Sequence, residues 1–103
     1  MGIVIRTEMN PDTGQQVMDE INPEGDTYTL QELYDICRCD IIQILRVNVD
    51  GMDKLMVVDE EGMMTGKQPN NAATDVLWEG NPNHRNFTVL LGDVAIIDDN
   101  QLN

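Results

Sequence analysis

Apolar and polar residues alternate at the start of the chain, over "GIVIRTEM". This period of two predicts a strand, with Ile3 and Ile5 on one face. The next residues, "NPDTG", combine proline, Asp and glycine, which is typical of a tight turn. "QQVMDEI" then has the alternation of a second strand. We therefore expect residues 1–22 to form a hairpin.

The clearest helix pattern follows the loop "NPEGDTYT". Thr29 can act as the N-cap residue, and Glu32, three positions later, completes the pattern of a capping box. Apolar residues then recur at helical spacing through Leu33 and Cys37. The pattern predicts a short helix over about residues 30–38.

The middle of the chain predicts two strands joined by a tight turn. "DIIQILRVNV" is apolar enough for a central strand, and Asp50-Gly51 is a preferred pair for a two-residue hairpin turn. "KLMVV" is the returning strand. A structural turn is predicted after it at Glu60, Glu61 and Gly62, followed by a short continuation of the strand.

A second helix is predicted near Asn70 or Asn71, covering "AATDVLW". An Asn at this position is a favoured N-cap, because its side-chain oxygen accepts a hydrogen bond from an N–H group of the first turn. The small residues after it would let the helix pack closely on a sheet. The loop "GNPNHRN" ends this helix.

The last strand is predicted over "FTVLLGDVAII", residues 87–97. The parity of its apolar positions changes partway along the strand, because successive side chains point to opposite faces. The first set is Phe87, Val89 and Leu91, and the second set is Val94 and Ile96. A bulge at Gly92-Asp93 would bend the strand and restore one inward face.

These elements predict an α+β fold in one domain, residues 1–103. We expect a small, mostly antiparallel sheet of about five to six strands, with two short helices packed on one side of it. The acidic and polar tail, residues 98–103, should fray. A single domain of this length can bury one modest core.

Charge changes the functional picture. The chain has 19 acidic and 6 basic residues, for a net charge of -13. We expect no direct binding to nucleic acid or anionic membranes, and attraction to basic protein surfaces. An alternative is that the charge serves solubility alone. No apolar run approaches the roughly 20 residues of a membrane span, so we expect a cytoplasmic protein.

Few residues could carry catalysis. The chain contains no serine, and its one histidine, His84, lies in a polar loop. Cys37 and Cys39 lack the further ligands of a zinc site, and we interpret them as reduced structural thiols. We therefore expect no catalytic residues, no metal, no cofactor and no enzymatic activity.

The polar stretch before the second helix is the candidate ligand site. A helix N-terminus favours anions because its first N–H groups lack partners within the helix. Lys67 would add a positive charge to a region of acids. The predicted ligand-binding residues are Lys67, Asn70, Asn71 and Thr74. The alternative is an ordinary capped helix that packs closely on the sheet.

Three stretches of the chain resemble a phage and mobile-element family catalogued as domain of unknown function 3846. They are "LQELYDICRCDIIQILRV", "KLMVVDEEGMMTGKQPNNAATDVLW" and "TVLLGDVAII", within about residues 30–97. The shared motifs are the turn from Val57 to Gly62, the helix start from Pro69 to Thr74, and Gly92 to Val94. The resemblance implies a phage or plasmid origin and the cytoplasm of an infected bacterium, and it carries no assigned activity.

We therefore expect a non-enzymatic binding protein that acts against a host defence. In the first hypothesis the polar stretch before the second helix, which we call the polar junction, sequesters a small anionic metabolite such as a nucleotide-derived signal. The site would be completed across the interface of a homo-oligomer. In the second, the acidic surface mimics nucleic acid and blocks a basic site on a host protein. A third hypothesis is a structural component of a phage assembly.

Overall fold

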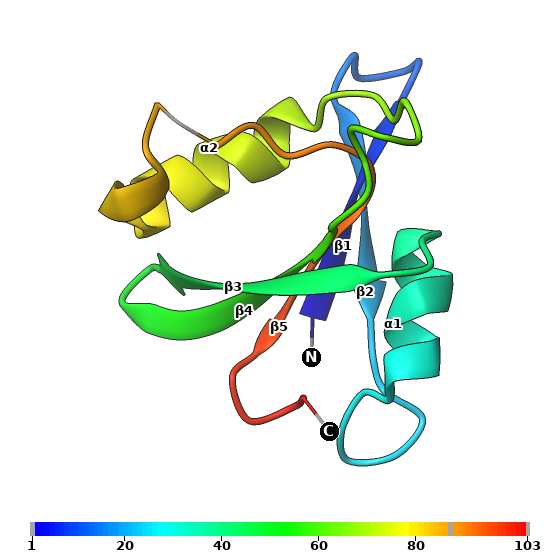
Figure 1. Cartoon of the computed structure of the whole chain (residues 1–103), viewed down its shortest axis with the longest axis vertical. Helices are drawn as coiled ribbons and strands as arrows, with labels where there is room; N and C mark the ends of the chain where they lie inside the picture. Colours follow the sequence, from blue (N-terminus) through cyan, green and yellow to red (C-terminus); the bar gives the residue numbers. More distant parts are fainter. Residues whose placement is uncertain (1, 87, 103) are drawn as a thin grey trace.

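The computed structural model describes residues 2–86 and 88–102. Two helices and a central sheet account for most of this part of the chain (Figure 1). The elements, in order, are β1 (Gly2–Met9), β2 (Gln16–Ile21), α1 (Leu30–Cys37), β3 (Ile42–Val49), β4 (Met52–Asp59), α2 (Asn71–Gly80), the 3₁₀ turn η1 (Pro82–His84) and β5 (Val94–Asp98).

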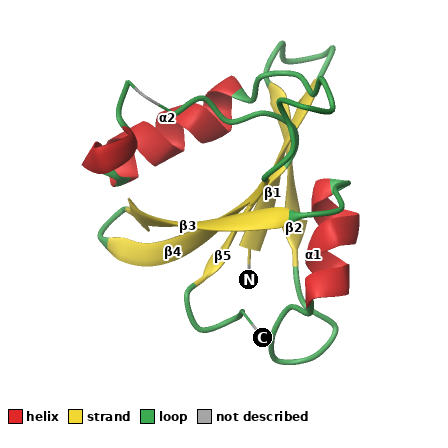
Figure 2. Cartoon of the chain, in the orientation of Figure 1, coloured by secondary structure: helices red, strands yellow, loops and turns green. Residues whose placement is uncertain are grey.

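The five strands form one sheet in the order β2-β1-β5-β4-β3, and every neighbouring pair is antiparallel (Figure 2). The predicted α+β class is therefore confirmed. The last strand in the sequence lies at the centre of the sheet, between β1 and β4. Two hairpins, β1–β2 and β3–β4, flank it and leave β2 and β3 as the edge strands.

The two helices lie on opposite faces of the sheet, so the prediction of helices on one side is wrong (Figure 1). The reason lies in β4, where consecutive residues point to opposite faces. Leu55 and Val57 pack in the cluster under α1, whereas Met56 and Val58 pack in the cluster under α2. A strand buried on both faces is apolar without alternation, as "LMVV" is.

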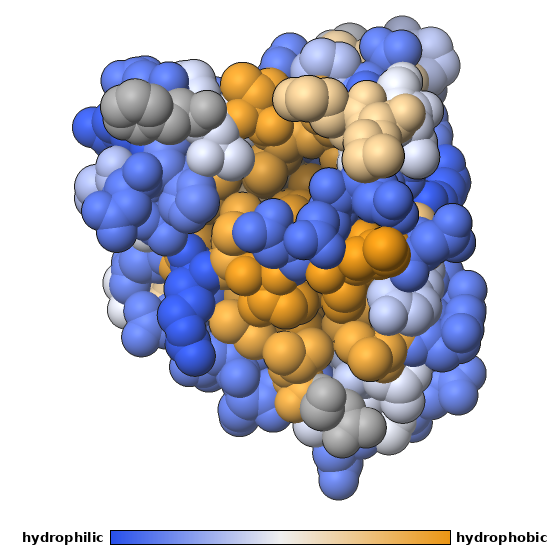
Figure 3. Space-filling view, viewed as in Figure 1, coloured by the Kyte–Doolittle hydropathy of each residue, from blue (hydrophilic) through white to orange (hydrophobic). Residues whose placement is uncertain are grey.

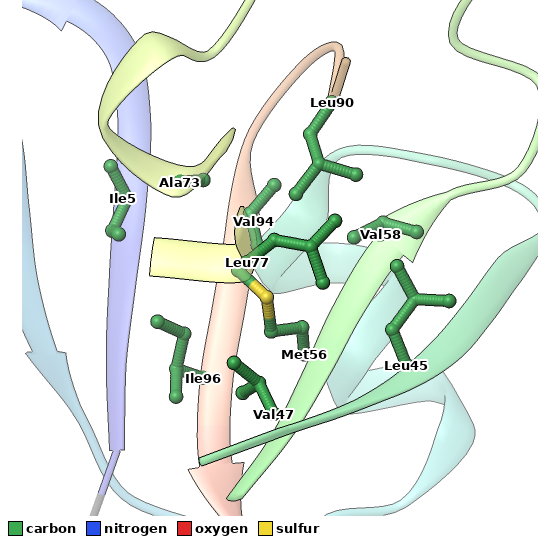
Figure 4. Packing of buried hydrophobic residues seen from close by; sticks show 10 residues of the cluster. All are labelled: Ile5, Leu45, Val47, Met56, Val58, Ala73, Leu77, Leu90, Val94 and Ile96. Atoms are coloured by element: carbon green, nitrogen blue, oxygen red, sulfur yellow. The ribbon is translucent and has the colours of Figure 1, made fainter. Parts of the chain in front are cut away.

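The larger of the two clusters lies between α2 and the sheet (Figure 4). Leu77 of α2 and Met56 of β4 are both fully buried. Ala73 lets the helix lie close to β1, because its methyl side chain leaves room for Ile5, which belongs to the same cluster. The buried members are Ile5, Leu45, Val47, Met56, Val58, Ala73, Leu77, Leu90, Val94 and Ile96.

Helix α1 begins as the sequence predicts. The Thr29 hydroxyl accepts the N–H of Glu32, and the Glu32 carboxylate accepts the N–H of Thr29, which is a complete capping box. The helix ends at Cys37, because Arg38 adopts a left-handed conformation at φ 53°. Leu33 and Cys37 are its buried residues.

The β3–β4 connection is the predicted two-residue turn. Asp50 and Gly51 have φ angles of 53° and 83°, the conformation that a hairpin turn of this kind requires at both central positions. The Asn48 side-chain oxygen accepts the Gly51 N–H at 3.1 Å. The strands pair without interruption from the turn to Ile42 and Asp59.

The predicted strand over 87–97 is shorter in the structure, and its bulge is absent. Strand β5 starts only at Val94, and Gly92, at φ +81°, redirects the chain before it. The segment before Gly92 leaves the sheet and meets the stretch that precedes α2, since the Gly92 N–H donates to the Gln68 carbonyl at 2.8 Å. Leu90 is the buried residue of this segment and Val89 is exposed, while Phe87 lies outside the described residues.

Two smaller expectations are also corrected. After β4 the chain does not continue as a strand but turns through residues 60–66. Residues 98–102 of the tail do not fray as expected: Asp98 ends β5, and the Tyr28 N–H donates to the Gln101 carbonyl at 2.7 Å, while residue 103 lies outside the described residues. The physical reason is that Leu102 packs against the apolar cluster under α1, beside the fully buried Tyr28.

Candidate functional site

Asn70 lies at the centre of the predicted ligand site, and it is fully buried. Its amide nitrogen donates to the carbonyls of Ile5 and Gly92, both at 2.9 Å. Its side-chain oxygen accepts the Ala73 N–H at 3.1 Å and the Gln16 side-chain amide at 2.8 Å. An Asn amide offers two donors and two acceptor positions, and all of them are occupied. Asn70 therefore fastens α2 to the sheet.

The first N–H groups of α2 are also used within the fold. The Ala72 N–H donates to the Gln16 side-chain oxygen at 2.9 Å, and the Ala73 N–H donates to Asn70. Gln16 is the first residue of β2, so the β1–β2 hairpin supplies a second cap to the helix. The groups that would bind an anion at a helix start are thus occupied by side chains.

Thr74 and Asn71, the other predicted ligand residues of the helix, differ in exposure. Thr74 is buried, and its hydroxyl donates to the Asn70 carbonyl at 2.8 Å and accepts the Leu90 N–H at 3.0 Å. Asn71 is exposed, and it borders a cleft of about 810 Å³ beside the β1–β2 hairpin. Asn70 and Thr74 thus form hydrogen bonds within the fold, and their contact with a ligand stays a prediction.

Lys67 is not a free positive charge. Its Nζ lies 2.6 Å from an Asp59 carboxylate oxygen and donates to the Arg38 carbonyl at 2.7 Å. The Asp59 side chain is 3% exposed, and its other oxygen accepts the Glu61 N–H at 2.8 Å. Because a buried carboxylate needs a partner, Lys67 neutralises Asp59 and closes the loop between β4 and α2. The predicted contact between Lys67 and a ligand stays a prediction.

A second ion-pair network lies beside the first. Asp93, 5% exposed, accepts from Arg6 at 2.8 Å and lies 3.6 Å from the Arg38 Nε. Arg38 also pairs with Glu8 at 2.6 Å. The hydrogen bond to Glu8, followed by the charge of Asp93, raises the pKa of the Arg38 guanidinium. Sequence analysis missed this network, because its residues come from β1, the end of α1 and the start of β5.

The two networks together contain three of the six basic residues and four acids, because Asp19 also lies 3.9 Å from the Arg6 Nε. These seven charges sum to -1, so the rest of the chain, with 15 acids and 3 bases, carries a net charge of -12. Most of the acidic side chains there are exposed. Acidic character is therefore a property of the surface, not of the interior.

The turn after β4 contains the predicted structural residues. Glu60 and Glu61 begin it, and Gly62 lies against Leu91, where an added Cβ would come within 3.1 Å of the Leu91 side chain. The Gly62 carbonyl accepts the Lys67 N–H at 3.0 Å and closes the loop. This turn forms one wall of a surface cleft whose other wall is the end of α1.

That cleft has a volume of about 410 Å³, and its lining includes four acids and the two bases Arg38 and Lys67, which pair with Glu8 and Asp59. Asp35, Asp40 and Glu61 line it, and none of the three is paired with a base among residues 2–86 and 88–102. Tyr34 adds an aromatic ring to the wall. We call this group of residues the acidic cleft. Because Arg38 and Lys67 already pair with acids, the three unpaired carboxylates suit a cationic side chain better than an anion.

The two thiols lie near the acidic cleft, and neither is activated. Burial raises the pKa of Cys37 to about 12, and the thiol lies 3.6 Å from the Val57 carbonyl. Burial, and then the charge of Asp59, raise the pKa of Cys39. Thiols with raised pKa values are poor nucleophiles, because the thiolate is the reactive form. Both cysteines are free.

The described residues contain no group of three or more His, Cys, Asp or Glu side chains that could hold a metal ion. His84 lies in η1 and contacts the Thr88 hydroxyl at 2.8 Å, far in the sequence from either cysteine. Among the same residues, no helix is long and apolar enough to cross a membrane.

Comparison with known proteins extends the resemblance found in the sequence. A search of curated proteins and a search of solved structures returned no match. A family model matches residues 6–102. This range begins within β1 and ends in the tail that follows β5. Since the match covers nearly the whole chain, this protein belongs to the family described as a domain of unknown function, DUF3846.

Proposed function

We propose that the protein is a non-enzymatic binding protein that occupies a basic, nucleic-acid-binding surface on another protein. One observation carries this proposal: four of the six basic residues, Arg6, Arg38, Lys54 and Lys67, are paired with acids within the fold. In the described part of the chain only Arg46 and Arg85 remain outside such pairs, and the whole chain has a net charge of -13. Carboxylates displayed at this density resemble the phosphates of a nucleic acid in charge. Such a surface steers a basic partner at long range.

The alternative proposal, sequestration of a nucleotide-derived signal, has less support from the geometry. Asn70 and Thr74 are buried, and Lys67 is paired with Asp59. A phosphate at the start of α2 would have to displace both the Asn70 cap and Gln16. The free energy lost with those hydrogen bonds would weaken phosphate binding.

The acidic cleft is the part of the surface that we assign to the partner's side chain. An arginine could stack on Tyr34 while its guanidinium donates to Asp35 and Glu61. Neither carboxylate forms an ion pair in the described part of the chain, since the bases that line the cleft, Arg38 and Lys67, pair with Glu8 and Asp59. We further propose that the setting is the one that the resemblance implies, a phage or mobile-element protein acting on a host defence protein in the cytoplasm.

The test uses an arginine-rich peptide as the probe, with binding followed by fluorescence anisotropy over a range of NaCl concentrations. The variant Asp35→Asn/Glu61→Gln should weaken binding tenfold or more, because both contacts are short-range. The matched control Asp12→Asn/Asp26→Asn removes the same charge from exposed positions outside the cleft. It should weaken binding far less.

The salt dependence supplies a second criterion. Affinity should fall steeply as NaCl rises, since screening shortens the range of the attraction. Affinity that is nearly independent of salt, or equal losses in the two double variants, would contradict the proposal. Calorimetric titration with cyclic and linear nucleotides completes the test, and binding of a nucleotide with no peptide binding would favour the alternative.

A further inference from the structure

The two most exposed large apolar side chains in the described part of the chain are neighbours in the turn after β4. Met63 and Met64 are each 84% exposed, whereas the next in order, Met9 and Met52, are 61% and 60% exposed. Scattered apolar residues are normal on a protein surface, but contiguous apolar area marks sites of interaction. Methionine also adapts to an uneven surface, because its side chain is flexible and polarizable. We call Met63 and Met64 the methionine tip.

Hydrogen bonds fix the turn that carries the methionine tip. The Thr65 hydroxyl and the Thr65 N–H both donate to the Glu61 carbonyl, at 3.1 Å and 3.0 Å. The Lys67 N–H donates to the Gly62 carbonyl at 3.0 Å, and the Glu61 N–H donates to the Asp59 carboxylate at 2.8 Å. Side chains on a fixed backbone lose less conformational entropy on binding. The turn therefore presents the tip in a conformation that is already prepared for contact.

The same turn is a shared wall of two clefts. Glu61 and Thr65 line the acidic cleft. Glu60, Gly62 and Met63 line a second cleft of about 180 Å³, which we call the shallow cleft. A partner that contacts the methionine tip can therefore reach into both clefts.

The shallow cleft combines apolar side chains with one unpaired acid. Of its two acids, Asp59 pairs with Lys67, whereas Glu60 is exposed and forms no ion pair among the described residues. Figure 3 shows apolar atoms at the surface above β3, between α2 and the turn after β4 as these lie in Figure 1. Five of the ten lining residues are apolar, namely Val58, Met63, Val89, Leu90 and Leu91, and no base is among the ten.

We propose that the methionine tip and the shallow cleft contact apolar side chains of the basic partner, beside the arginine that enters the acidic cleft. The inference rests on the proposed function for the partner's charge and adds apolar residues to the description of that partner. On the partner's surface, bases flank an apolar area, because they meet Glu60 on one side of the turn and Asp35 and Glu61 on the other. Binding then combines long-range attraction between charges with burial of apolar area at short range.

The charges around the methionine tip select this occupant over two others. A second copy that laid its own tip on the shallow cleft would bring the acids of both turns together, and each copy carries a net charge of -13. An anionic membrane would be repelled by the same acids. Of these three occupants, only a basic partner gains from Glu60 and Glu61 as well as from the apolar contact.

The experiment compares two peptides that contain the same number of arginines. In the first peptide leucines alternate with the arginines, and in the second peptide serines replace the leucines. Fluorescence anisotropy at about 0.5 M NaCl measures the contribution of apolar contact, because the attraction between charges is screened at this concentration. The wild-type protein should bind the leucine peptide at least tenfold more tightly than the serine peptide.

The variant Met63→Gln/Met64→Gln should reduce this ratio at least fivefold, because glutamine keeps the length of methionine but not its apolar character. Its affinity for the serine peptide at low salt should not change. The control Leu30→Gln/Met52→Gln removes two other apolar side chains, 53% and 60% exposed, that line neither cleft, and it should keep the ratio. Thermal melts followed by circular dichroism check that both variants fold as stably as the wild type.

The outcomes separate this inference from the proposed function. Equal affinity for the two peptides, with both weakened by Asp35→Asn/Glu61→Gln, would overturn the inference and support the proposed function. A leucine preference that survives in the methionine variant would also overturn the inference. A preference that requires the methionine tip but not Asp35 and Glu61 would support the tip and contradict the proposed role of the acidic cleft. Self-association or binding to phosphatidylserine vesicles, lost in the methionine variant and without peptide binding, would overturn the inference in favour of a second copy or a membrane.

Discussion

Asn70 shows how much one buried polar side chain can hold in place. Its amide contacts β1, the start of β5, the hairpin and its own helix, and each contact is a hydrogen bond of 2.8–3.1 Å. Removing such a side chain leaves buried carbonyls unpaired in addition to losing a cap. The cost should therefore exceed that of an ordinary N-cap.

We expect Asn70→Ala to lower the free energy of unfolding by roughly 3 kcal/mol, from the lost cap and the unpaired carbonyls of Ile5 and Gly92. Urea denaturation gives the value. The control Asn71→Ala changes the same residue type at the next, exposed position, and should cost less than about 0.5 kcal/mol. Similar losses in the two variants would mean that Asn70 acts only as a cap.

Gly92 is the residue at which the chain enters the central strand. Its φ of +81° disfavours any side chain, and a Cβ there would lie 2.8 Å from the Lys67 Cδ. Gly92→Ala should destabilise the fold by about 1–2 kcal/mol, and Gly92→Val by more, because a β-branched residue tolerates positive φ poorly. Chemical denaturation is the measurement.

The matched control for this prediction is Gly66→Ala. Gly66 has a similar φ of +71°, but nothing lies within 4 Å of an added Cβ. The difference in stability between the two variants therefore separates the effect of contact with Lys67 from the effect of backbone strain. A Gly92→Ala protein no less stable than Gly66→Ala would show that the lysine side chain simply moves aside.

At the scale of elements, helix α1 depends on a local motif whose strength varies with pH. The backbone N–H of Thr29, followed by that of Glu24, lowers the pKa of the Glu32 carboxyl. The carboxylate therefore stabilises the fold above its unfolded pKa of about 4.3, and this contribution is lost as pH falls through the lowered folded value. Glu32 thus links the capping box to acid stability.

We expect Glu32→Gln to melt below wild type at pH 7, with a gap that narrows as pH falls under about 4.3. Thermal melts followed by circular dichroism across this range test it. Glu20→Gln removes the same charge from an exposed strand residue, with no hydrogen bond to its side chain in the described chain. A gap of constant size at every pH would indicate that the Glu32 charge has no role.

The placement of the helices is also settled at this scale. The predicted helices exist, but β4 and β5 supply apolar side chains to both faces of the sheet, and each helix covers one of them. A helix signal in a sequence reports which residues face inward, not which side of a sheet they meet. The expectation of a one-sided layer was wrong for this reason.

For the whole molecule, the surplus of surface acids should act against folding. Like charges repel most strongly in the compact state, and salt screens them. We expect the melting temperature to rise by a few degrees as NaCl increases from about 0.02 M to about 0.5 M. The measurement is a thermal melt at low protein concentration.

A variant with fewer surface acids serves as the control for this effect. Asp12→Asn/Asp26→Asn/Glu79→Gln removes three exposed charges and leaves the ion-pair networks intact. Its melting temperature should depend less on salt. A wild-type melting temperature that falls with salt would mean that the pairs around Asp93 and Asp59 outweigh the repulsion.

Local patterns were sufficient for the features that arise within a few residues of each other. The capping box of α1 spans Thr29 to Glu32, and the Asp50-Gly51 turn needs only its own backbone conformation. The strand periods and the surplus of acids are likewise present in any conformation of the chain. These features depend on near neighbours, so the sequence contains the information needed to predict them.

The role of the junction depends on residues that only folding brings together. Gln16 and Asn70 are 54 residues apart, and Arg6 and Asp93 are 87 apart, yet each pair is in contact. The sequence shows an Asn and a Lys beside a helix start, which suits a ligand site and a packed junction equally. Folding decides which hydrogen bonds remain for a ligand. The Asn70 amide uses all of its donors and acceptor positions within the fold, whereas the Lys67 ammonium has three donors and uses two of them, on Asp59 and the Arg38 carbonyl.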